Sequence, residues 1–290
     1  MRAGNARDQP RRCAYPAEMT DLRDQITEHY ESGDEDARLR SGIGRLELER
    51  VREIVRRSLP EAPARVLDVG GATGVHAEWL LADGFEVHLV DLLESHVARA
   101  RELLGGAPGF SAEAGDARAL PVADGAYDVV LLLGPLYHLQ EAADRVAAWR
   151  EAVRAVRPGG AVIGMAISRF ASVFDGLAWG SLFDPRFREV VETDLATGRH
   201  ENPDRNPQWF TTAYFQRPDE LAAEASSAGL AGVEVLGVQG IAGWMRELGP
   251  RMDDDAGRET LLWSARAVES EPSVLGLSPH LLAVGRRPAT

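Results

Sequence analysis

The chain has 290 residues, of which 44% are hydrophobic and 27% charged, and these values predict a soluble globular protein with one large domain or one domain with a sizeable insertion. The formal net charge of -13 disfavours the phosphate backbone of nucleic acids as a partner and favours a small-molecule substrate. Every basic residue among the 32 is an arginine, which excludes Schiff-base enzymes and P-loop kinases because both need a lysine.

The chain has a single cysteine, Cys13, which excludes an intramolecular disulfide and argues against a cysteine-ligated zinc site. Arg11 and Arg12 resemble the start of a twin-arginine export signal, but no apolar run follows them. No window approaches 18 uninterrupted apolar residues, the length that a membrane span requires. We therefore expect a cytoplasmic protein without membrane contact, either a monomer or a homodimer.

The N-terminal part of the chain divides into a tail and a helical region. Residues 1–18 are rich in Arg, Asp, Gly and Pro without a period, which predicts a mobile tail. Residues 19–60 have a helical pattern that is broken near Gly33 and at residues 42–44. We expect these N-terminal helices to close over a ligand that the following residues bind.

Short apolar strands alternate with helices in residues 61–168. The strand at residues 127–133 is an almost continuous apolar run, which is typical of a central parallel strand. The alternation predicts an α/β fold with a doubly wound, Rossmann-like, mostly parallel sheet. The expected strands are residues 66–69, 86–90, 109–114, 127–133 and 161–167, and the expected helices are residues 75–82, 95–104 and 142–156, with a turn at 157–160.

Residues 169–217 interrupt this alternation and are rich in aromatic side chains. Within residues 170–215 lie six of the eight phenylalanines, two tryptophans and one tyrosine. We expect a cap inserted after the fifth strand, whose aromatic side chains exclude water from a substrate or form the cap's own core. Residues 218–290 resume the alternation, with a helix near 219–228 and strands at 233–238 and 281–284, and complete a seven-stranded sheet.

A glycine-rich turn with the sequence GGATG lies at residues 70–74, between the first strand and its helix. Such a turn lets a ligand approach the backbone, and the helix N-terminus favours negative charge. A dinucleotide fingerprint would need glycines where Ala72 and Val75 stand, so NAD is disfavoured. Asp91 ends the second strand 21 residues after Gly70, the spacing of a ribose-binding acid one βα unit later.

Residues 68–74, with the sequence DVGGATG, resemble motif I of the class I S-adenosylmethionine-dependent methyltransferases. The resemblance covers about residues 60–167 and includes GDA at residues 115–117, YD at 127–128 and RPGG at 157–160. Ala72 departs from the family pattern, in which a third glycine is common at this position. The resemblance implies S-adenosylmethionine as the cofactor and methyl transfer as the activity.

The resemblance also implies which residues bind the cofactor. In the family, the loop backbone contacts the amino-acid moiety, an acid such as Asp91 holds the ribose hydroxyls, and Asp116 contacts the adenine. A carboxylate suits both of these acidic positions because hydroxyl and amino groups donate to it. A Tyr or Arg of the N-terminal helices reaches the cofactor carboxylate in related enzymes. The expected cofactor-binding residues are Tyr30, Arg45, Asp68, Gly70, Gly71, Gly74, Asp91, Leu92, Gly115, Asp116, Ala117 and Leu133.

The loop after the fourth strand, residues 133–138, is expected to face the methyl group because ligands bind at the carboxyl ends of parallel strands. It lacks the leading Asn or Asp of the Asn/Asp-Pro-Pro-Tyr/Phe motif, which argues against methylation of amide nitrogens. His138 is a candidate general base, since its ordinary pKa near 6.5 suits proton abstraction at neutral pH. The alternative is a supporting or helix-capping histidine. Tyr137 either lines the methyl-transfer channel or packs.

Four residues in or beside the cap are candidates for substrate binding: Arg169, Phe170, His200 and Tyr214. Arg169 could hold a substrate carboxylate through two hydrogen bonds, whereas His200 could instead lie in a surface loop. His138, His200 and His280 could be ligands of one metal ion, but no H-x-x-x-H or H-E-x-x-H pair is present, so we expect no metal.

Together these features predict methyl transfer from S-adenosylmethionine to an O, N or C nucleophile of a small, partly apolar metabolite. The alternative from another class is a non-catalytic regulator or partner subunit that binds the cofactor on the same fold. A third interpretation, aminopropyl transfer from a decarboxylated cofactor, is disfavoured by the aromatic cap.

Overall fold

The computed structural model describes residues 35–202, 206 and 209–289. The predicted tail at residues 1–18 and the predicted cofactor residue Tyr30 lie outside these residues. None of the helices in the described part of the chain is long and apolar enough to span a membrane.

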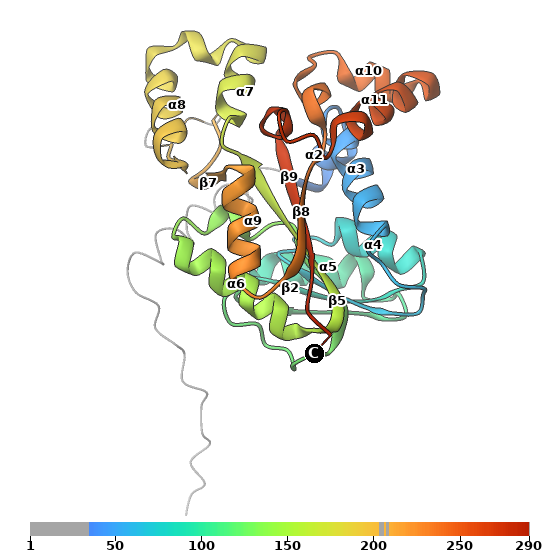
Figure 1. Cartoon of the computed structure of the whole chain (residues 1–290). Coiled ribbons are helices and arrows are strands. Elements are labelled where there is room, and N and C mark those ends of the chain that lie inside the picture. Colours follow the sequence, from blue (N-terminus) through green and yellow to red (C-terminus); the bar gives the residue numbers. More distant parts are fainter. Residues whose placement is uncertain (1–34, 203–205, 207–208, 290) are drawn as a thin grey trace, which may run out of the picture.

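The centre of the molecule is a mostly parallel, Rossmann-like sheet, which has nine strands within the described residues (Figure 1). Five parallel strands lie in the order β3-β2-β1-β4-β5, and β9 continues the sheet antiparallel to β5, followed by β8. Their bounds are β1 Arg65–Val69, β2 Glu86–Asp91, β3 Phe110–Ala114, β4 Tyr127–Leu132, β5 Val156–Ser168, β8 Ala231–Gly237 and β9 His280–Arg286.

The expected number of seven strands is too small by two. The additional strands are β6, Arg199–His200, and β7, Ala213–Gln216, and both belong to the segment predicted as a cap. β7 pairs in parallel with the last two residues of β5, and β6 pairs with β7 in antiparallel orientation. These strands have two and four residues, too short to produce an alternating pattern of their own.

Helices cover both faces of the sheet. The bounds of these helices are α3 Gly44–Arg56, α4 Val75–Ala82, α5 Glu94–Leu104, α6 Ala142–Ala155 and α9 Pro218–Ser227. Apolar residues of α3 and α4 pack with Val66 and Val87 on one face, where α5 also packs against Leu89. Apolar residues of α6 and α9 pack with Leu67 and Val69 on the other face. Because side chains alternate along β1, Asp68 lies on the face that α3 and α4 cover.

Two groups of helices stand beyond the carboxyl ends of the parallel strands (Figure 1). The first is the cap, residues 169–217, with α7 Ala171–Trp179, the 3-10 turn η2 Ser181–Phe183 and α8 Pro185–Thr197. The second contains α2 Glu35–Arg40, the 3-10 turn η3 Gly240–Trp244, α10 Leu248–Asp253 and α11 Asp255–Val268, and a further 3-10 turn, η4 Leu275–Leu277, precedes β9. The sequence pattern predicted neither the cap helices nor α10 and α11.

The predicted turn at residues 157–160 is wrong as a boundary, because these residues lie inside β5. The strand accommodates them through a shift of its register with β4 between Tyr127 and Val129. Gly159 has a φ of +76° there, a value that glycine adopts without steric cost. The two glycines therefore produce an irregularity in a continuous strand instead of ending it.

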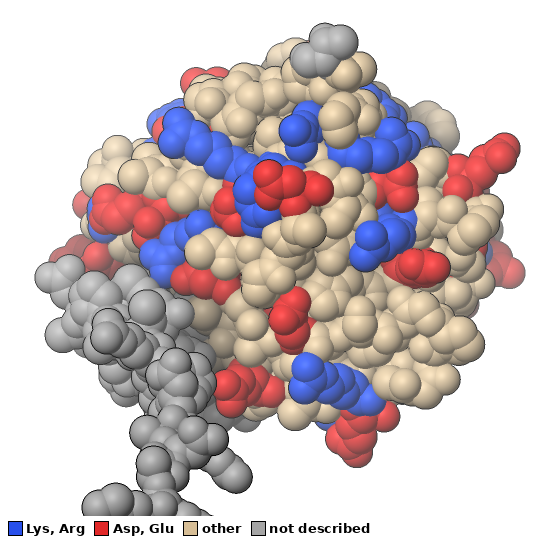
Figure 2. Space-filling model, turned by 90° about the horizontal axis from the view of Figure 1, so that it is seen from below, with Lys and Arg blue, Asp and Glu red and all other residues tan. Residues whose placement is uncertain are grey.

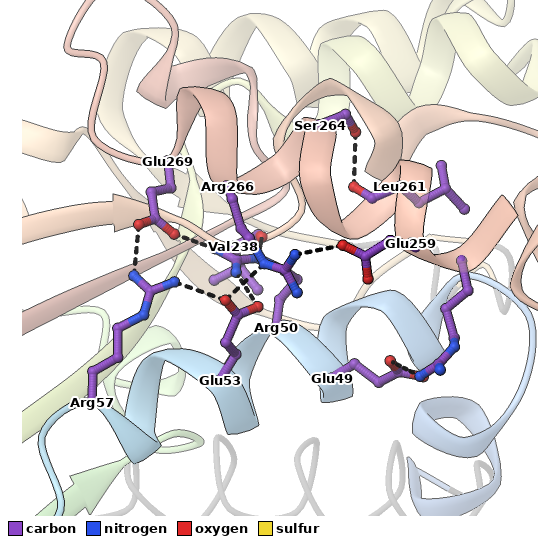
Figure 3. Close-up of polar contacts among 11 residues, drawn as sticks. Glu49, Arg50, Glu53, Arg57, Val238, Glu259, Leu261, Ser264, Arg266 and Glu269 are labelled. Atoms are coloured by element: carbon purple, nitrogen blue, oxygen red, sulfur yellow. Dashed lines mark hydrogen bonds and ion pairs between the residues drawn. The ribbon is translucent and has the colours of Figure 1, made fainter. Parts of the chain in front are cut away.

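A network of charged side chains connects the N-terminal and C-terminal helices (Figure 3). Arg50 on α3 is fully buried, and it donates to the Val238 carbonyl oxygen at 3.1 Å, to Glu53 at 2.6 Å and to Glu269. Arg57 donates to both of these carboxylates, at 3.0 and 2.6 Å. Burial raises the pKa of Glu53 and Glu269, but the neighbouring guanidinium groups outweigh it and hold both pKa values below their ordinary value. The network fixes α3 to the end of α11.

Acidic and basic side chains are interspersed on the face of the molecule seen in Figure 2. Basic and acidic groups lie next to one another across the part of this face that is not grey.

Candidate active site

The glycine-rich turn after β1 lies against the loop that follows β4. Gly70 has a φ of +71°, and a Cβ atom added to it would lie 2.7 Å from Cδ of Pro135. A Cβ atom on Gly134 would likewise lie 2.7 Å from the Gly70 carbonyl oxygen. Ala72, which stands where motif I commonly has a third glycine, has a φ of +47°. The turn therefore keeps the left-handed geometry of a glycine loop despite the methyl group.

Asp68 lies directly beneath this turn and is fully buried. Neither of its carboxylate oxygens has a hydrogen-bond partner within the described residues, and a Cβ atom on Gly71 would lie 2.6 Å from Oδ2. Burial, and secondarily the charge of Asp91, raise the pKa of Asp68 to about 7. A buried carboxylate without a partner is costly, and a cationic ligand in the turn would offset that cost.

Asp91 ends β2 and faces the same turn. Its Oδ2 accepts a hydrogen bond from the Ala72 backbone N–H at 2.9 Å, and its Oδ1 accepts from the Leu93 N–H at 2.9 Å. Nδ1 of His96 lies 3.1 Å from Oδ1. A carboxylate accepts about four hydrogen bonds, and three of these positions on Asp91 are already occupied. One further donor can bind, and a second can bind only if the His96 contact is lost. The arrangement suits a ribose hydroxyl, and His96 is a neighbour that the sequence motifs did not reveal.

Asp116 lies at the end of β3 and forms an ion pair that the motifs did not predict either. Its Oδ1 accepts from the Arg118 backbone N–H at 2.9 Å, and its Oδ2 from the Arg118 guanidinium at 2.6 Å. Arg118 also donates to Asp144 on α6 at 2.9 Å. Gly115 is needed here because a Cβ atom would lie 2.8 Å from the Val90 side chain. An adenine amino group that donates to Asp116 would therefore bind a carboxylate that also accepts from Arg118.

The loop after β4 continues into the 3-10 turn η1, Leu136–His138, which brings aromatic rings of distant segments together. Tyr137 and His138 are both buried, and their ring centroids are 4.7 Å apart. The Phe210 ring lies 6.4 Å from Tyr137, 6.5 Å from His138 and 6.3 Å from His200. We call Tyr137, His138, His200 and Phe210 the aromatic cluster. It joins two predicted catalytic residues and one predicted substrate residue around Phe210, which was not singled out.

His200 is not in a surface loop, because it is 2% exposed and belongs to β6. Its Nδ1 lies 2.8 Å from Oδ2 of Asp194 on α8, and Ser172 on α7 donates to the same oxygen. The imidazole stacks on Phe215 with the centroids 4.8 Å apart and the planes 12° from parallel. The sequence did not predict Ser172 and Asp194 as site residues, because a single serine and a single aspartate within the cap segment form no motif.

The other predicted cap residues lie in a network with α9. Arg169 is buried and donates to the Phe215 carbonyl oxygen at 2.7 Å and to Glu220 at 2.7 Å. It also lies 3.2 Å from the Tyr214 hydroxyl, and the Arg145 guanidinium covers the Tyr214 ring at 3.6 Å. These contacts occupy two of the Arg169 nitrogens that a substrate carboxylate would need. Phe170 packs separately, beneath the guanidinium of Arg217.

The remaining predicted residues are distributed over both helix groups. Arg45 donates to the Met252 carbonyl oxygen at 2.8 Å and to Asp253, so it extends toward α10. Leu133 is buried at the end of β4, and Leu92 and Ala117 are half-buried after β2 and β3. No group of three or more His, Cys, Asp or Glu residues that could hold a metal ion occurs in the described part of the chain. His280 contacts Gln239 and Glu47 instead, with its Nδ1 at 2.9 and 3.6 Å.

These features define an α/β protein whose glycine turn and strand-end carboxylates form a cradle for a nucleoside cofactor with a cationic part. S-adenosylmethionine fits the cradle, because it offers an ammonium group and a sulfonium for Asp68, which lacks a partner in the described part of the chain, and ribose hydroxyls for Asp91.

Comparison with known proteins agrees with this class. A family model described as a methyltransferase domain matches residues 66–160. A demethylmenaquinone methyltransferase of Beutenbergia cavernae is 34% identical over 99 residues, which are 34% of this chain and 39% of that protein. A ubiquinone biosynthesis O-methyltransferase of Aromatoleum aromaticum is 31% identical over 180 residues, which are 61% of this chain and 68% of that protein.

Solved structures share the fold. An S-adenosylmethionine-dependent methyltransferase of Mesorhizobium loti superposes with a TM-score of 0.53 at 17% identity, over 83% of this chain and all of that one. The chain belongs to the class I S-adenosylmethionine-dependent methyltransferases. It spans 39%, 65% and 38% of the length of three of the curated relatives that it matches.

Proposed function

We propose that the protein transfers the methyl group of S-adenosylmethionine to an O, N or C nucleophile of a small, partly apolar metabolite. The observation that carries the proposal is the buried carboxylate of Asp68 beneath the glycine turn, which has no hydrogen-bond partner among the described residues. The cofactor supplies an activated methyl group on a good leaving group. The protein contributes proximity and alignment, because no covalent intermediate is needed.

On the cofactor side, the chain binds and orients. Asp68 accepts from the ammonium group and becomes fully ionised, while Asp91 accepts from a ribose hydroxyl. Asp116, held by Arg118, accepts from the adenine amino group. The backbone of residues 70–74 approaches the ligand closely because its glycines leave no side chains in the way.

On the acceptor side, the aromatic cluster favours a planar substrate that stacks between rings and excludes water. The names of two relatives, which refer to demethylmenaquinone and to ubiquinone biosynthesis, agree with an acceptor that is planar and partly apolar. An acceptor that starts protonated also needs a base. Within the described residues, His138 and His200 both contact Phe210, and both are candidates for this role.

Calorimetry with S-adenosylmethionine and S-adenosylhomocysteine tests the cofactor half of the proposal. We expect both ligands to bind the wild type and to bind an Asp91→Asn variant at least tenfold more weakly. Absence of binding to the wild type would remove the proposal altogether. The Glu86→Gln variant, changed at an exposed position at the start of β2, is the matched control and should bind like the wild type.

A screen for cofactor-dependent release of S-adenosylhomocysteine tests the transfer half. The panel should hold hydroxylated aromatic compounds with and without an apolar tail, together with amines of similar size. Turnover of any of them supports the proposal. Tight cofactor binding without turnover across the panel would favour the alternative, a cofactor-binding regulator or partner subunit.

A further inference from the structure

A buried hydrogen-bonded pair in the cap has the geometry of a base with its orienting group. Asp194 on α8 is completely buried, and its Oδ2 lies 2.8 Å from Nδ1 of His200. Ser172 donates to the same oxygen and so fixes the carboxylate in turn. We propose that His200, oriented by Asp194, accepts the proton of a hydroxyl acceptor during methyl transfer. This inference rests on the proposed methyltransferase activity and names the acceptor class.

The second nitrogen of His200 shows why a purely structural role is insufficient. The His200 side chain is only 2% exposed, and its buried Nε2 atom has no hydrogen-bond partner within the described residues. A histidine that merely joined β6 to α8 would need Nδ1 alone. Leaving a buried polar atom without a partner costs free energy, so its persistence points to a ligand that supplies the partner.

The position of β6 brings this nitrogen to the acceptor side of the site. His200 pairs with Ala213 of β7, and the Ala213 carbonyl oxygen accepts from the Gln140 side chain at 3.4 Å. Arg199 donates to the Gln140 side-chain oxygen at 3.1 Å. Gln140 follows η1, the turn at the carboxyl end of β4, so the strand pair is fastened to the loop that faces the methyl group.

Hydrogen bonding to Asp194 determines which nitrogen carries the proton. An ionised carboxylate is an acceptor, so Nδ1 of a neutral His200 carries the hydrogen and Nε2 keeps its lone pair. In the reaction, the acceptor oxygen forms a bond to the methyl carbon, and the carbon–sulfur bond breaks with its electron pair going to sulfur. The hydroxyl proton passes to Nε2, and the imidazolium that results is stabilised by Asp194. Charge balances, because the sulfonium charge is lost as the imidazolium charge appears.

Among the described residues, titratable and charged groups lie near His200 on α8, on η1 and at the junction of β5 and α7. Asp194 comes from α8, while Tyr137 and His138 of η1 contact the same Phe210 ring that His200 contacts. The guanidinium of Arg169 also lies close to this strand. A Cβ atom added to Gly198, the residue before β6, would lie 2.5 Å from it. His138 contributes a ring contact to Phe210, and His200 has the hydrogen-bonded carboxylate that a base requires.

The first test concerns the protein alone and needs no substrate. Nitrogen NMR of the full chain with labelled histidine, at pH 8, should show His200 as the neutral tautomer with hydrogen on Nδ1. The assignment comes from the His200→Gln spectrum, in which that signal is missing. Hydrogen on Nε2, or an imidazolium at this pH, would overturn the proposal whether or not an acceptor is known.

The second test measures turnover with phenol-type acceptors of graded acidity, from a simple phenol to a nitrophenol. We expect His200→Gln to lower turnover of the simple phenol at least about 100-fold, as the loss of a general base does. Turnover should recover toward the wild-type value as pH rises, and it should recover at lower pH for the nitrophenol, because an ionised acceptor needs no base. A uniform loss at all pH values, or no loss, would overturn the role of His200.

Asp194 is a positioning residue, and its variants separate orientation from folding. Asp194→Asn should lower turnover and move the His200 hydrogen from Nδ1 to Nε2 in the NMR spectrum. Asp194→Glu should retain part of the turnover and part of the wild-type tautomer signal. The His88→Gln variant, on β2, serves as the matched histidine control and should turn over normally. Cofactor affinity within about threefold of wild type shows that each variant is folded. If the wild type binds no cofactor, the proposed function fails, whereas normal cofactor binding without turnover of any phenol refutes the hydroxyl acceptor only.

Discussion

Replacing Asp68 by asparagine should make the protein without cofactor more stable at pH 8 and less able to bind S-adenosylmethionine. The side chain is fully buried, and its oxygens have no hydrogen-bond partner in the described chain. Burial and the nearby charge of Asp91 raise its pKa from 3.8 to about 7. Asparagine has nearly the same shape but no charge, so the substitution removes the electrostatic cost and keeps the packing.

The size of the effect follows from the two pKa values of Asp68. Because the folded-state pKa is raised, the stability linked to this group is complete below pH 3.8 and is lost as pH rises through about 7. A difference of about three pKa units corresponds to about 4 kcal/mol when the carboxyl is ionised in both states. Between pH 5 and pH 8, the wild type should lose about 2 to 3 kcal/mol of unfolding free energy relative to Asp68→Asn.

Urea unfolding of both proteins at pH 5 and pH 8, without cofactor, measures this difference. Added S-adenosylmethionine should reverse the order at pH 8, because the asparagine side chain cannot neutralise an ammonium group. We expect its affinity for the cofactor to fall roughly 10- to 100-fold, the usual worth of a hydrogen bond to a charged group. Parallel pH profiles for the two proteins would show that Asp68 is ionised and compensated in the folded state, and would refute the reasoning.

Three further changes test other parts of the structure. Arg50→Ala removes the buried guanidinium that Glu53, Glu269 and the Val238 carbonyl oxygen share, while Arg57 still pairs with both half-buried carboxylates, and it should lower the unfolding free energy by about 1.5–3 kcal/mol in urea titrations, whereas Arg99→Ala, which breaks an exposed pair, should cost under about 1 kcal/mol. Gly71→Ala places a methyl group 2.6 Å from a carboxylate oxygen and should abolish cofactor binding in calorimetry, while Gly106→Ala, with open space around it, should not. His138→Ala should lower turnover at least tenfold in the S-adenosylhomocysteine release assay, with cofactor affinity within a few-fold; unchanged turnover would remove His138 from the site.

The arrangement of the glycine turn and of the carboxylates Asp68 and Asp91 around it could be predicted because its geometry is local. Asp68, Gly70 and Gly71 are neighbours in the chain, and a strand followed by a glycine turn and a helix allows few arrangements of them. The position of Asp91 follows from parallel pairing of β1 with β2, which aligns their carboxyl ends. The motifs did not predict the residues that contact these acids, such as His96 and Arg118. The side chains of His96 and Arg118 reach the acids only after the loops fold.

The cap could not be predicted to the same degree, because its contacts join residues far apart in sequence. Ser172 is 22 residues from Asp194, and Phe210 reaches back to η1. One local signal was nevertheless present. Asp184 caps the N-terminus of α8, Pro185 occupies its first position, and Gly198 with a φ of +81° ends it. This combination is a regular start and stop signal for a helix.

The two halves of the site share one physical property that connects structure to function. Asp68 beneath the glycine turn and His200 in the cap each keep a buried polar atom without a hydrogen-bond partner in the described residues. Such atoms lower stability, so a fold retains them where a ligand supplies the missing partner. The donor would supply an ammonium group to Asp68, and the acceptor would supply a hydroxyl to His200. Binding of both substrates would therefore complete hydrogen bonds that folding alone leaves unmade.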